Sequence, residues 1–298
     1  MTASEPTATT INFIAYFDDP SHARWVNDAT TKLAEKHHSR AIVVDATREG
    51  EHTTSPFALE ARGLSPERLR ERVATALAPD LPTVLWWTDD AMSANPAFEA
   101  LVDLTDALVI NTSGNERDEA MVVELAAFVE ARPTVSVRDI AWMRLRPWQD
   151  MIAQSFDDAS LREELFSIRG VRIVAGSDAE ALYLGGWLAS RLGWTACARN
   201  EFCDRTGVHI PFHAIREGKA RRICSVEVQT ISSTYSATVS ADDDDVLILS
   251  SHGPIERPKR TVQLAAIDNA TLLERAILEP ATDEIFEAAL RMVAALVR

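Results

Sequence analysis

Histidine and cysteine are the residue types in this chain that could bind a metal ion through side-chain nitrogen and sulfur. His209 and His213 lie four positions apart in a stretch expected to be a β-strand, which separates them by about 13 Å and prevents them from sharing one ion. Cys197 and Cys203 lie six positions apart, without a second pair at the spacing of a zinc ligand set, and Cys224 stands alone. We therefore expect no metal site and three structural thiols. Cys197 and Cys203 could still face each other across a turn, and a redox-sensing role stays open.

Phosphate-binding and nucleophile motifs are missing from the sequence. None of the 11 glycines lies two positions from another glycine, so the G-x-G-x-x-G loop of dinucleotide-binding proteins cannot occur. The G-x-x-x-x-G-K-[ST] loop and the G-x-S-x-G elbow of serine hydrolases are also absent. Small residues at 111–114 could expose backbone amides to a phosphate, but an ordinary connection from a strand to a helix is the simpler interpretation. The sequence therefore predicts no catalytic residues and no bound cofactor, and we expect a protein that is not an enzyme.

A segment at residues 133–148 has the composition of a binding surface. Its three arginines and single acidic residue give it a net charge of +2 within a chain of charge -15, and it holds two tryptophans. Tryptophan and arginine dominate binding hot spots because they combine a large desolvated area with directional hydrogen-bond donors. We predict that a partner protein binds Arg138, Trp142, Arg144, Arg146 and Trp148. Composition leaves an alternative equally open, in which the tryptophans anchor the core and the arginines pair with local acids.

Charge and composition restrict the classes of function. The 298 residues carry 30 Lys and Arg against 45 Asp and Glu, and this excess of negative charge repels nucleic-acid phosphates and anionic lipids. No apolar run approaches the length of a membrane span, and residues 1–10 lack the basic and then apolar order of a signal peptide. Three cysteines in a chain of this length suit a reducing compartment. We therefore expect a cytoplasmic protein that binds neither nucleic acid nor membranes.

The first half of the chain alternates between strand and helix patterns. Short apolar runs without polar alternation are followed by segments whose apolar residues recur at helical spacing. The expected strands lie at residues 10–17, 41–45, 83–87, 108–111 and 134–137, and the expected helices at 22–37, 67–77, 96–104 and 117–131. Because such strands are buried on both sides, we predict a mostly parallel, Rossmann-like sheet with helices on both faces.

The second half begins with one more β-α-β unit and then changes to strands with alternating polarity. The expected unit lies at residues 171–175, 178–192 and 195–199, and the later strands at 209–216, 222–230, 234–240, 246–250 and 261–266. Helices at 271–278 and 283–297 end the chain, the second with Thr282 as its N-cap. We predict an N-terminal α/β domain at residues 1–160 and a C-terminal α+β domain with a largely antiparallel sheet at residues 161–298.

Four segments also form a specific pattern along the chain. They are HHSRAIVVD at 37–45, LPTVLWW at 81–87, R-D-x-x-W-x-R-L-x-P-W at 138–148 and GGWLASRLGW at 185–194. This pattern resembles the glucose-6-phosphate dehydrogenase assembly protein family, OpcA. The resemblance implies a non-catalytic protein that binds and activates glucose-6-phosphate dehydrogenase at the start of the oxidative pentose phosphate pathway.

Two other functions are compatible with the predicted fold. An enzyme or sensor for a sugar phosphate or nucleotide would hold its ligand at the carboxyl ends of the parallel strands. A structural subunit would bind a partner without regulating it. A rise in melting temperature with a physiological small ligand would favour the enzyme or sensor over the activator.

Overall fold

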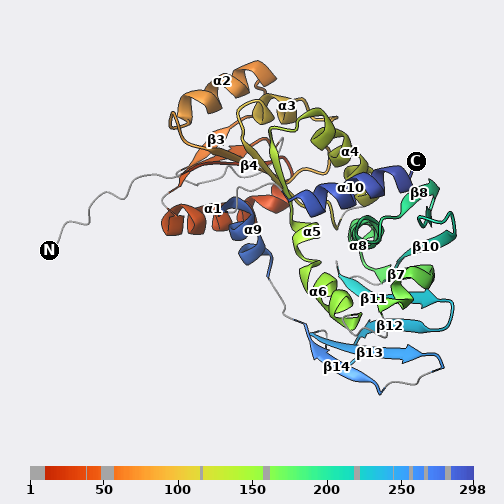
Figure 1. The fold of residues 1–298 in the computed structure, drawn as a ribbon. Helices are drawn as coiled ribbons and strands as arrows, with labels where there is room; N and C mark the ends of the chain where they lie inside the picture. Colours follow the sequence, from red (N-terminus) through yellow and green to blue (C-terminus); the bar gives the residue numbers. More distant parts are fainter. Residues whose placement is uncertain are drawn as a thin grey trace. The chain divides into compact units, whose positions relative to one another are not determined.

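The protein folds into two compact units, each assembled from separate stretches of the chain (Figure 1). The computed structural model describes residues 11–37, 39–47, 57–114, 117–156, 162–217, 222–243, 245–254, 258–264, 268–278 and 283–298. Unit 1 comprises Met1–Asn111, Val129–Ile140 and Asn269–Thr282, and unit 2 comprises Thr112–Phe128, Ala141–Asp268 and Asp283–Arg298. These units differ from the expected contiguous division near residue 160, because residues 112–128 and 141–160 belong to unit 2 and Asn269–Thr282 belongs to unit 1.

Unit 1 is built on a six-stranded sheet in the order β3-β2-β1-β4-β5-β6, and the pairings among these strands are parallel. The strands are β1 Asn12–Phe17, β2 Arg40–Asp45, β3 Ala58–Glu60, β4 Thr83–Trp87, β5 Ala107–Ile110 and β6 Ser136–Asp139. Every residue of β1, β4 and β5 is buried, as expected for strands covered by helices on both sides. The predicted Rossmann-like sheet is therefore confirmed.

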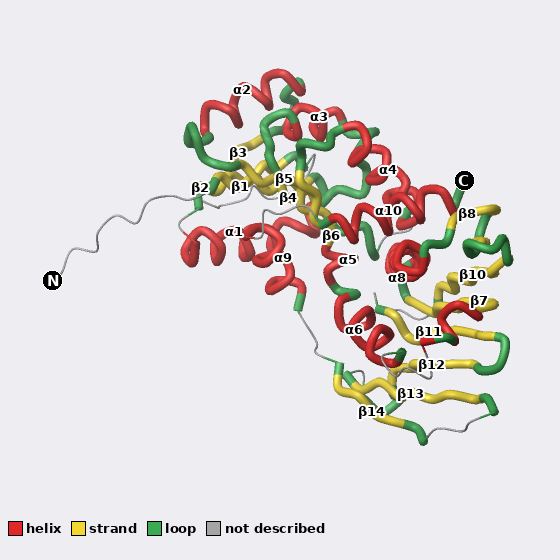
Figure 2. Tube along the Cα trace, viewed as in Figure 1, coloured by secondary structure: helices red, strands yellow, loops and turns green. Residues whose placement is uncertain are grey.

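Helices cover both faces of this sheet. Figure 2 shows α2 and α3 on one face and α1 and α9 on the other. Their bounds are α1 Ala23–His37, α2 Pro66–Ala76, α3 Pro96–Val102 and α9 Asn269–Leu278, and a short 3-10 helix, η1 Pro20–His22, precedes α1. Local sequence sets where α2 and α3 begin, because each starts with proline after a side-chain cap, Ser65 or Asn95. Helix α4, Asp118–Ala131, starts in unit 2 and ends in unit 1.

Unit 2 contains an eight-stranded sheet in the order β14-β13-β12-β11-β7-β10-β9-β8. The strands are β7 Ile168–Ala175, β8 Thr195–Ala198, β9 Glu201–Cys203, β10 His209–Arg216, β11 Ile223–Thr230, β12 Thr234–Val239, β13 Val246–His252 and β14 Arg260–Gln263. Among the pairings of these described strands, β7 with β10 is parallel and the others are antiparallel. This confirms the predicted, largely antiparallel second sheet.

One detail of the predicted topology is wrong. Residues 195–199 were expected to complete a β-α-β unit beside β7, but β10 occupies that position. Strand β8 instead lies at the far edge of the sheet, because a turn at Arg199 and Asn200 reverses the chain and pairs β8 with β9. Asn200 has a φ of 58°, in the left-handed region that asparagine tolerates and that a tight turn requires.

The helices of unit 2 include two that pack closely against each other, α8 Asp178–Leu192 and α10 Glu284–Leu296. A Cβ atom at Gly186 of α8 would lie 2.6 Å from the carbonyl oxygen of Ala289 in α10, so this approach requires glycine. The N-cap of α10 is Asp283, which accepts hydrogen bonds from the amides of Ile285 and Phe286. The expected cap, Thr282, lies outside the described residues.

Among the described residues, unit 2 also contains α6 Arg146–Ser155 and the 3-10 helix η2 Glu164–Ser167, and α5 Ile140–Met143 runs from the last residue of a unit 1 stretch into unit 2. Among the described helices of both units, none has the length and apolar character needed to cross a membrane.

Candidate functional site

Both tryptophans of the segment at residues 133–148 are buried. Trp142, in α5, donates a hydrogen bond from Nε1 to Oδ2 of Asp283 over 2.9 Å, and its ring lies 5.5 Å from that of Phe286. Asp283 uses its other carboxylate oxygen to cap α10, so one side chain fixes both Trp142 and the start of that helix. Trp148 is buried on α6. The structure therefore places both rings in the core.

Arg144 lies next to a buried carboxylate. Its guanidinium forms an ion pair with Glu180, in the first turn of α8, and donates a hydrogen bond to Oγ of Ser113 over 3.0 Å. The Arg144 side chain is 13% exposed and that of Glu180 is 1% exposed. A carboxylate at this depth needs a cation and hydrogen-bond donors to offset its lost hydration, and Arg144 supplies both.

The other two arginines differ in their exposure. Arg138, in β6, is buried and donates a hydrogen bond to the backbone oxygen of Val137. Arg146 is 68% exposed and pairs with Asp150 one turn further along α6. Of the five residues predicted to bind a partner, Arg146 alone presents its side chain to solvent. Both tryptophans are buried, and Arg144 and Arg146 pair with local acids, as in the alternative interpretation. The binding role of the segment stays a prediction.

An exposed apolar pair that the sequence analysis did not identify lies on unit 2. Phe166, in η2, is 74% exposed, and Ile231, in the turn between β11 and β12, is 68% exposed. The amide of Ile231 donates to the backbone oxygen of Ser167 over 3.0 Å, so the two turns are joined. We call Phe166 and Ile231 the 166/231 patch. Each of the two is an apolar residue in a polar turn, which is a signal in the sequence. That signal could not identify an exposed patch, because apolar residues are usually buried.

Polar contacts fix the backbone around the 166/231 patch. The carboxylate of Glu164 accepts hydrogen bonds from the hydroxyls of Thr230 and Ser232. The bond from Ser232, followed by that from Thr230, lowers the pKa of Glu164 below its usual range. Exposed apolar side chains within a polar rim are typical of a protein-binding surface.

The carboxyl edge of the unit 1 sheet is where a Rossmann-like fold would hold a nucleotide. Strand β1 lies between β2 and β4 at the point where the strand order reverses, and a pocket of about 710 Å³ opens beside the ends of β1 and β4. Two carboxylates, Asp18 and Asp89, line this pocket, and Asn95 donates hydrogen bonds to Asp89 and to the hydroxyl of Tyr16.

The charge of this pocket disfavours a phosphate ligand. Partial burial, followed by the negative charge of Asp89, raises the pKa of Asp18 to about 6, so Asp18 is largely ionised at neutral pH. A pyrophosphate at this position would meet like charge in place of the amides of a glycine-rich loop. The geometry is that of a nucleotide-binding edge, whereas the chemistry is unsuited to an anionic cofactor.

At the second candidate phosphate position, residues 111–114, a carboxylate of unit 2 accepts the hydrogen bond of a backbone amide. The amide of Gly114 donates to Oδ1 of Asp118 over 3.0 Å, and the hydroxyl of Ser177 donates to Oδ2 of the same carboxylate. Asp118 is buried, so its carboxylate occupies the place that a bound anion would take. This supports the simpler interpretation, a connection from a strand to a helix.

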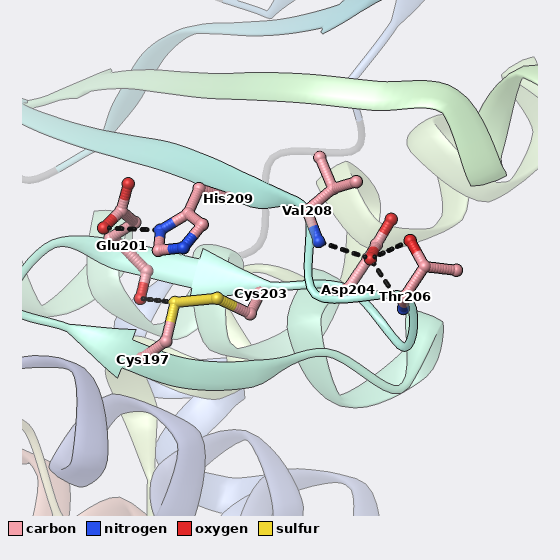
Figure 3. The surroundings of a disulfide bond; sticks show 7 residues. All are labelled: Cys197, Glu201, Cys203, Asp204, Thr206, Val208 and His209. Carbon is pink, nitrogen blue, oxygen red and sulfur yellow. Dashed lines mark hydrogen bonds and ion pairs between the residues drawn. A yellow bond between two sulfur atoms is a disulfide. The ribbon is translucent and has the colours of Figure 1, made fainter.

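Cys197 and Cys203 form a disulfide, so the prediction of structural thiols at these two positions is wrong (Figure 3). The hairpin of β8 and β9 brings the two residues together with their Cα atoms 5.8 Å apart, within the range of a disulfide. Residues six positions apart reach this distance only because the turn at Asn200 is tight. Cys224 takes no part in a disulfide.

Comparison with known proteins gives a family and a fold. Residues 135–290, more than half of the chain, match the family model for the C-terminal domain of the glucose-6-phosphate dehydrogenase subunit OpcA. A protein of Synechocystis sp. named "Putative OxPP cycle protein OpcA" is 30% identical over 131 residues, which are 43% of this chain and 27% of that protein. A Nostoc punctiforme protein of the same name is 32% identical over 130 residues, 43% of this chain and 28% of that protein. The matches therefore span about a quarter of each relative's length.

Solved structures with a similar fold include a ketoreductase and a dehydrogenase. A mutant of KijD10, a 3-ketoreductase from Actinomadura kijaniata in complex with TDP-benzene and NADP, has a TM-score of 0.57 at 12% identity and covers 97% of this chain and 96% of its own. Levoglucosan dehydrogenase, in complex with NADH and L-sorbose, has a TM-score of 0.52 at 12% identity, with the same coverage. At such identity the likeness shows the fold alone.

Proposed function

We propose that this chain, which belongs to the OpcA family of glucose-6-phosphate dehydrogenase subunits, binds glucose-6-phosphate dehydrogenase and promotes its active assembly in the oxidative pentose phosphate pathway. The observation that carries the proposal is the family match over residues 135–290. The names of the curated relatives, which refer to the oxidative pentose phosphate cycle, support it. Its place of action would be the cytoplasm, with the dehydrogenase.

The chemistry of the sheet edge supports a role without catalysis. The structural neighbours were solved in complex with NADP or NADH. In this chain the carboxyl edge of the sheet carries Asp18 and Asp89, and the glycine-rich loop is absent from the sequence. A protein that kept the fold without the phosphate-binding apparatus would be free to serve as a binding partner.

Activation would follow from differential binding. A partner that binds the active form of the dehydrogenase more tightly than the inactive form shifts the enzyme towards the active form. A coupling free energy of about 1–3 kcal/mol, typical of such linkage, corresponds to roughly a 5- to 150-fold preference.

The 166/231 patch is the proposed contact with the dehydrogenase, and Arg146 is a candidate for a second contact. A phenylalanine and an isoleucine already exposed in the free protein need not be uncovered before binding, and the polar contacts of Glu164 hold their turns in place. Arg138, Trp142, Arg144 and Trp148 would support binding by folding their segment.

The test is the dehydrogenase rate in mixtures of the two purified proteins, measured across a size-exclusion peak. We expect co-elution, a higher kcat/KM for glucose 6-phosphate, and no turnover by this chain alone. Co-elution with an unchanged rate would support a structural subunit instead. A melting-temperature rise of the isolated chain with glucose 6-phosphate or NADP, without co-elution, would support the small-molecule alternative.

Two substitutions test the contact itself. Phe166→Ser and Ile231→Ser should each weaken dehydrogenase binding by about 1–3 kcal/mol, the range of a hot-spot residue, with little change in melting temperature. Ile285→Ser is the matched control, because Ile285 is 39% exposed on the same unit but lies on α10. If both patch variants bind the dehydrogenase with wild-type affinity, the contact lies elsewhere on the protein, and the family assignment is unaffected.

A further inference from the structure

Three potential metal ligands converge at the edge of the unit 2 sheet, on the neighbouring strands β8, β9 and β10. The strand register places Cys203 of β9 opposite Thr195 on one side and opposite His209 of β10 on the other. One ligand atom each of Cys197, Cys203 and His209 lies within 4.8 Å of the others. Figure 3 shows the imidazole of His209 beside the two sulfur atoms.

We propose that Cys197, Cys203 and His209 bind one zinc ion when the two cysteines are reduced. Two thiolates and an imidazole are a ligand set that zinc prefers. Tetrahedral zinc, with bonds of about 2.3 Å to sulfur and 2.0–2.1 Å to nitrogen, requires ligand atoms about 3.5–3.8 Å apart. The three ligand atoms lie within 4.8 Å of one another, and separation of the two sulfurs with rotation of the side chains on the hairpin would bring them to that spacing.

The carboxylate of Glu201 gives His209 the partner that a zinc-binding histidine needs. Its Oε2 lies 3.1 Å from Nδ1 of His209 (Figure 3). A proton held on Nδ1 by this carboxylate leaves Nε2 with the free electron pair that binds the metal, the usual arrangement at zinc sites. Three candidate ligands and a carboxylate that can orient one of them thus lie together in one short segment.

The nearby carboxylate of Asp204 stabilises a turn and is not one of the three proposed ligands. Its Oδ1 accepts hydrogen bonds from the hydroxyl and amide of Thr206 and from the amide of Val208, which close the turn between β9 and β10. The protein thus offers three ligands, and a water molecule would complete the tetrahedron. The open fourth position suits an ion that exchanges with solvent, because β8 is an edge strand and His209 is largely exposed.

Zinc binding and the disulfide exclude each other. A dithiol reductant supplies two electrons and two protons, becomes a cyclic disulfide itself, and converts the Cys197–Cys203 disulfide to two thiols. Zinc then displaces the two thiol protons to solvent as its bonds to the two sulfurs form. The ion carries two positive charges and the thiolates two negative charges, so the assembled site adds no net charge to the edge.

The experiment is a zinc titration of the full chain, reduced with a dithiol and desalted under argon, against a chromophoric zinc chelator. We expect one zinc ion per reduced chain and none per oxidised chain, with cobalt substitution giving a thiolate-to-metal charge-transfer band. Failure of the reduced wild-type chain to compete with the chelator would overturn the proposal.

Variants then test each ligand. Cys203→Ser should abolish binding, His209→Ala should weaken it at least tenfold, and Glu201→Gln should weaken it about 10- to 100-fold, the range for a carboxylate behind a metal-bound histidine. The matched control is His213→Ala, an exposed histidine four residues further along the same strand. Equal zinc affinity in His209→Ala and His213→Ala would refute the site even if Cys203→Ser failed to fold.

Discussion

Removal of the Arg144 guanidinium should cost far more stability than removal of the neighbouring Arg146 guanidinium, although both arginines belong to the same short motif. Arg144→Ala removes from Glu180, which is 1% exposed, a cation that offsets its desolvation. Breaking a buried ion pair from one side costs about 3–5 kcal/mol. Because the Arg144 side chain is 13% exposed, water can partly enter the space that it leaves. We therefore expect the free energy of unfolding to fall by about 3 kcal/mol, the lower end of this range.

Arg146→Ala provides the internal comparison. Its partner Asp150 is 52% exposed and lies one helical turn away, and such pairs contribute about 0.3–0.5 kcal/mol. The expected difference between the two variants is therefore more than about 2 kcal/mol, well above the error of a denaturation curve.

Urea unfolding of the two variants, monitored by circular dichroism, measures this difference. A third variant, Arg144→Ala with Glu180→Gln, removes the buried charge and should recover a substantial part of the loss. Equal stability of Arg144→Ala and Arg146→Ala, or no recovery in the double variant, would show that the carboxylate of Glu180 reaches water easily and would refute the argument from burial.

Three further outcomes are expected. Trp142→Phe removes the indole hydrogen bond to Asp283 and should lower the free energy of unfolding by about 1–3 kcal/mol, measured by urea titration, whereas an unchanged value would mean that water replaces the indole. Gly186→Ala should cost about 1–3 kcal/mol, because the new methyl group meets the backbone oxygen of Ala289, and a melt equal to that of wild type would contradict the close approach of α8 and α10. Asp18→Asn should raise the melting temperature at pH 7.5 but not at pH 4.5. The raised pKa of Asp18, about 6, means that stability from its protonated form is lost as pH rises from about 4 through 6, and exposure to water should keep the gain below about 1 kcal/mol.

The first sheet could be predicted well because its strands carry their own signal. Residues 83–87 are an apolar run without polar alternation, which only a strand buried on both faces tolerates, and they form β4. Ser65 followed by proline sets the start of α2 for an equally local reason. Such features depend on neighbours within a few positions, so composition and spacing are sufficient to find them.

Features that depend on distant residues could not be predicted in this way. The burial of Trp142 depends on Asp283, 141 positions later, and that of Arg144 on Glu180, 36 positions later. The motif could show that these side chains matter but not whether they face a partner or the core. The place of β8 at the sheet edge likewise depends on the pairing of β10 with β7, which local patterns do not encode.

The sequence-defined family domain and the folded units do not coincide, and this affects how the domain can be inherited. The matched region, residues 135–290, contains β6 and α9 of unit 1 but none of β1–β5, and it ends inside α10. A gene fragment limited to that region would encode β6 without the neighbouring strand β5 that pairs with it. A recombination event at the edges of the recognised domain should therefore yield a chain that cannot fold cooperatively. An exchange of this module between proteins would therefore have to carry the preceding strands as well.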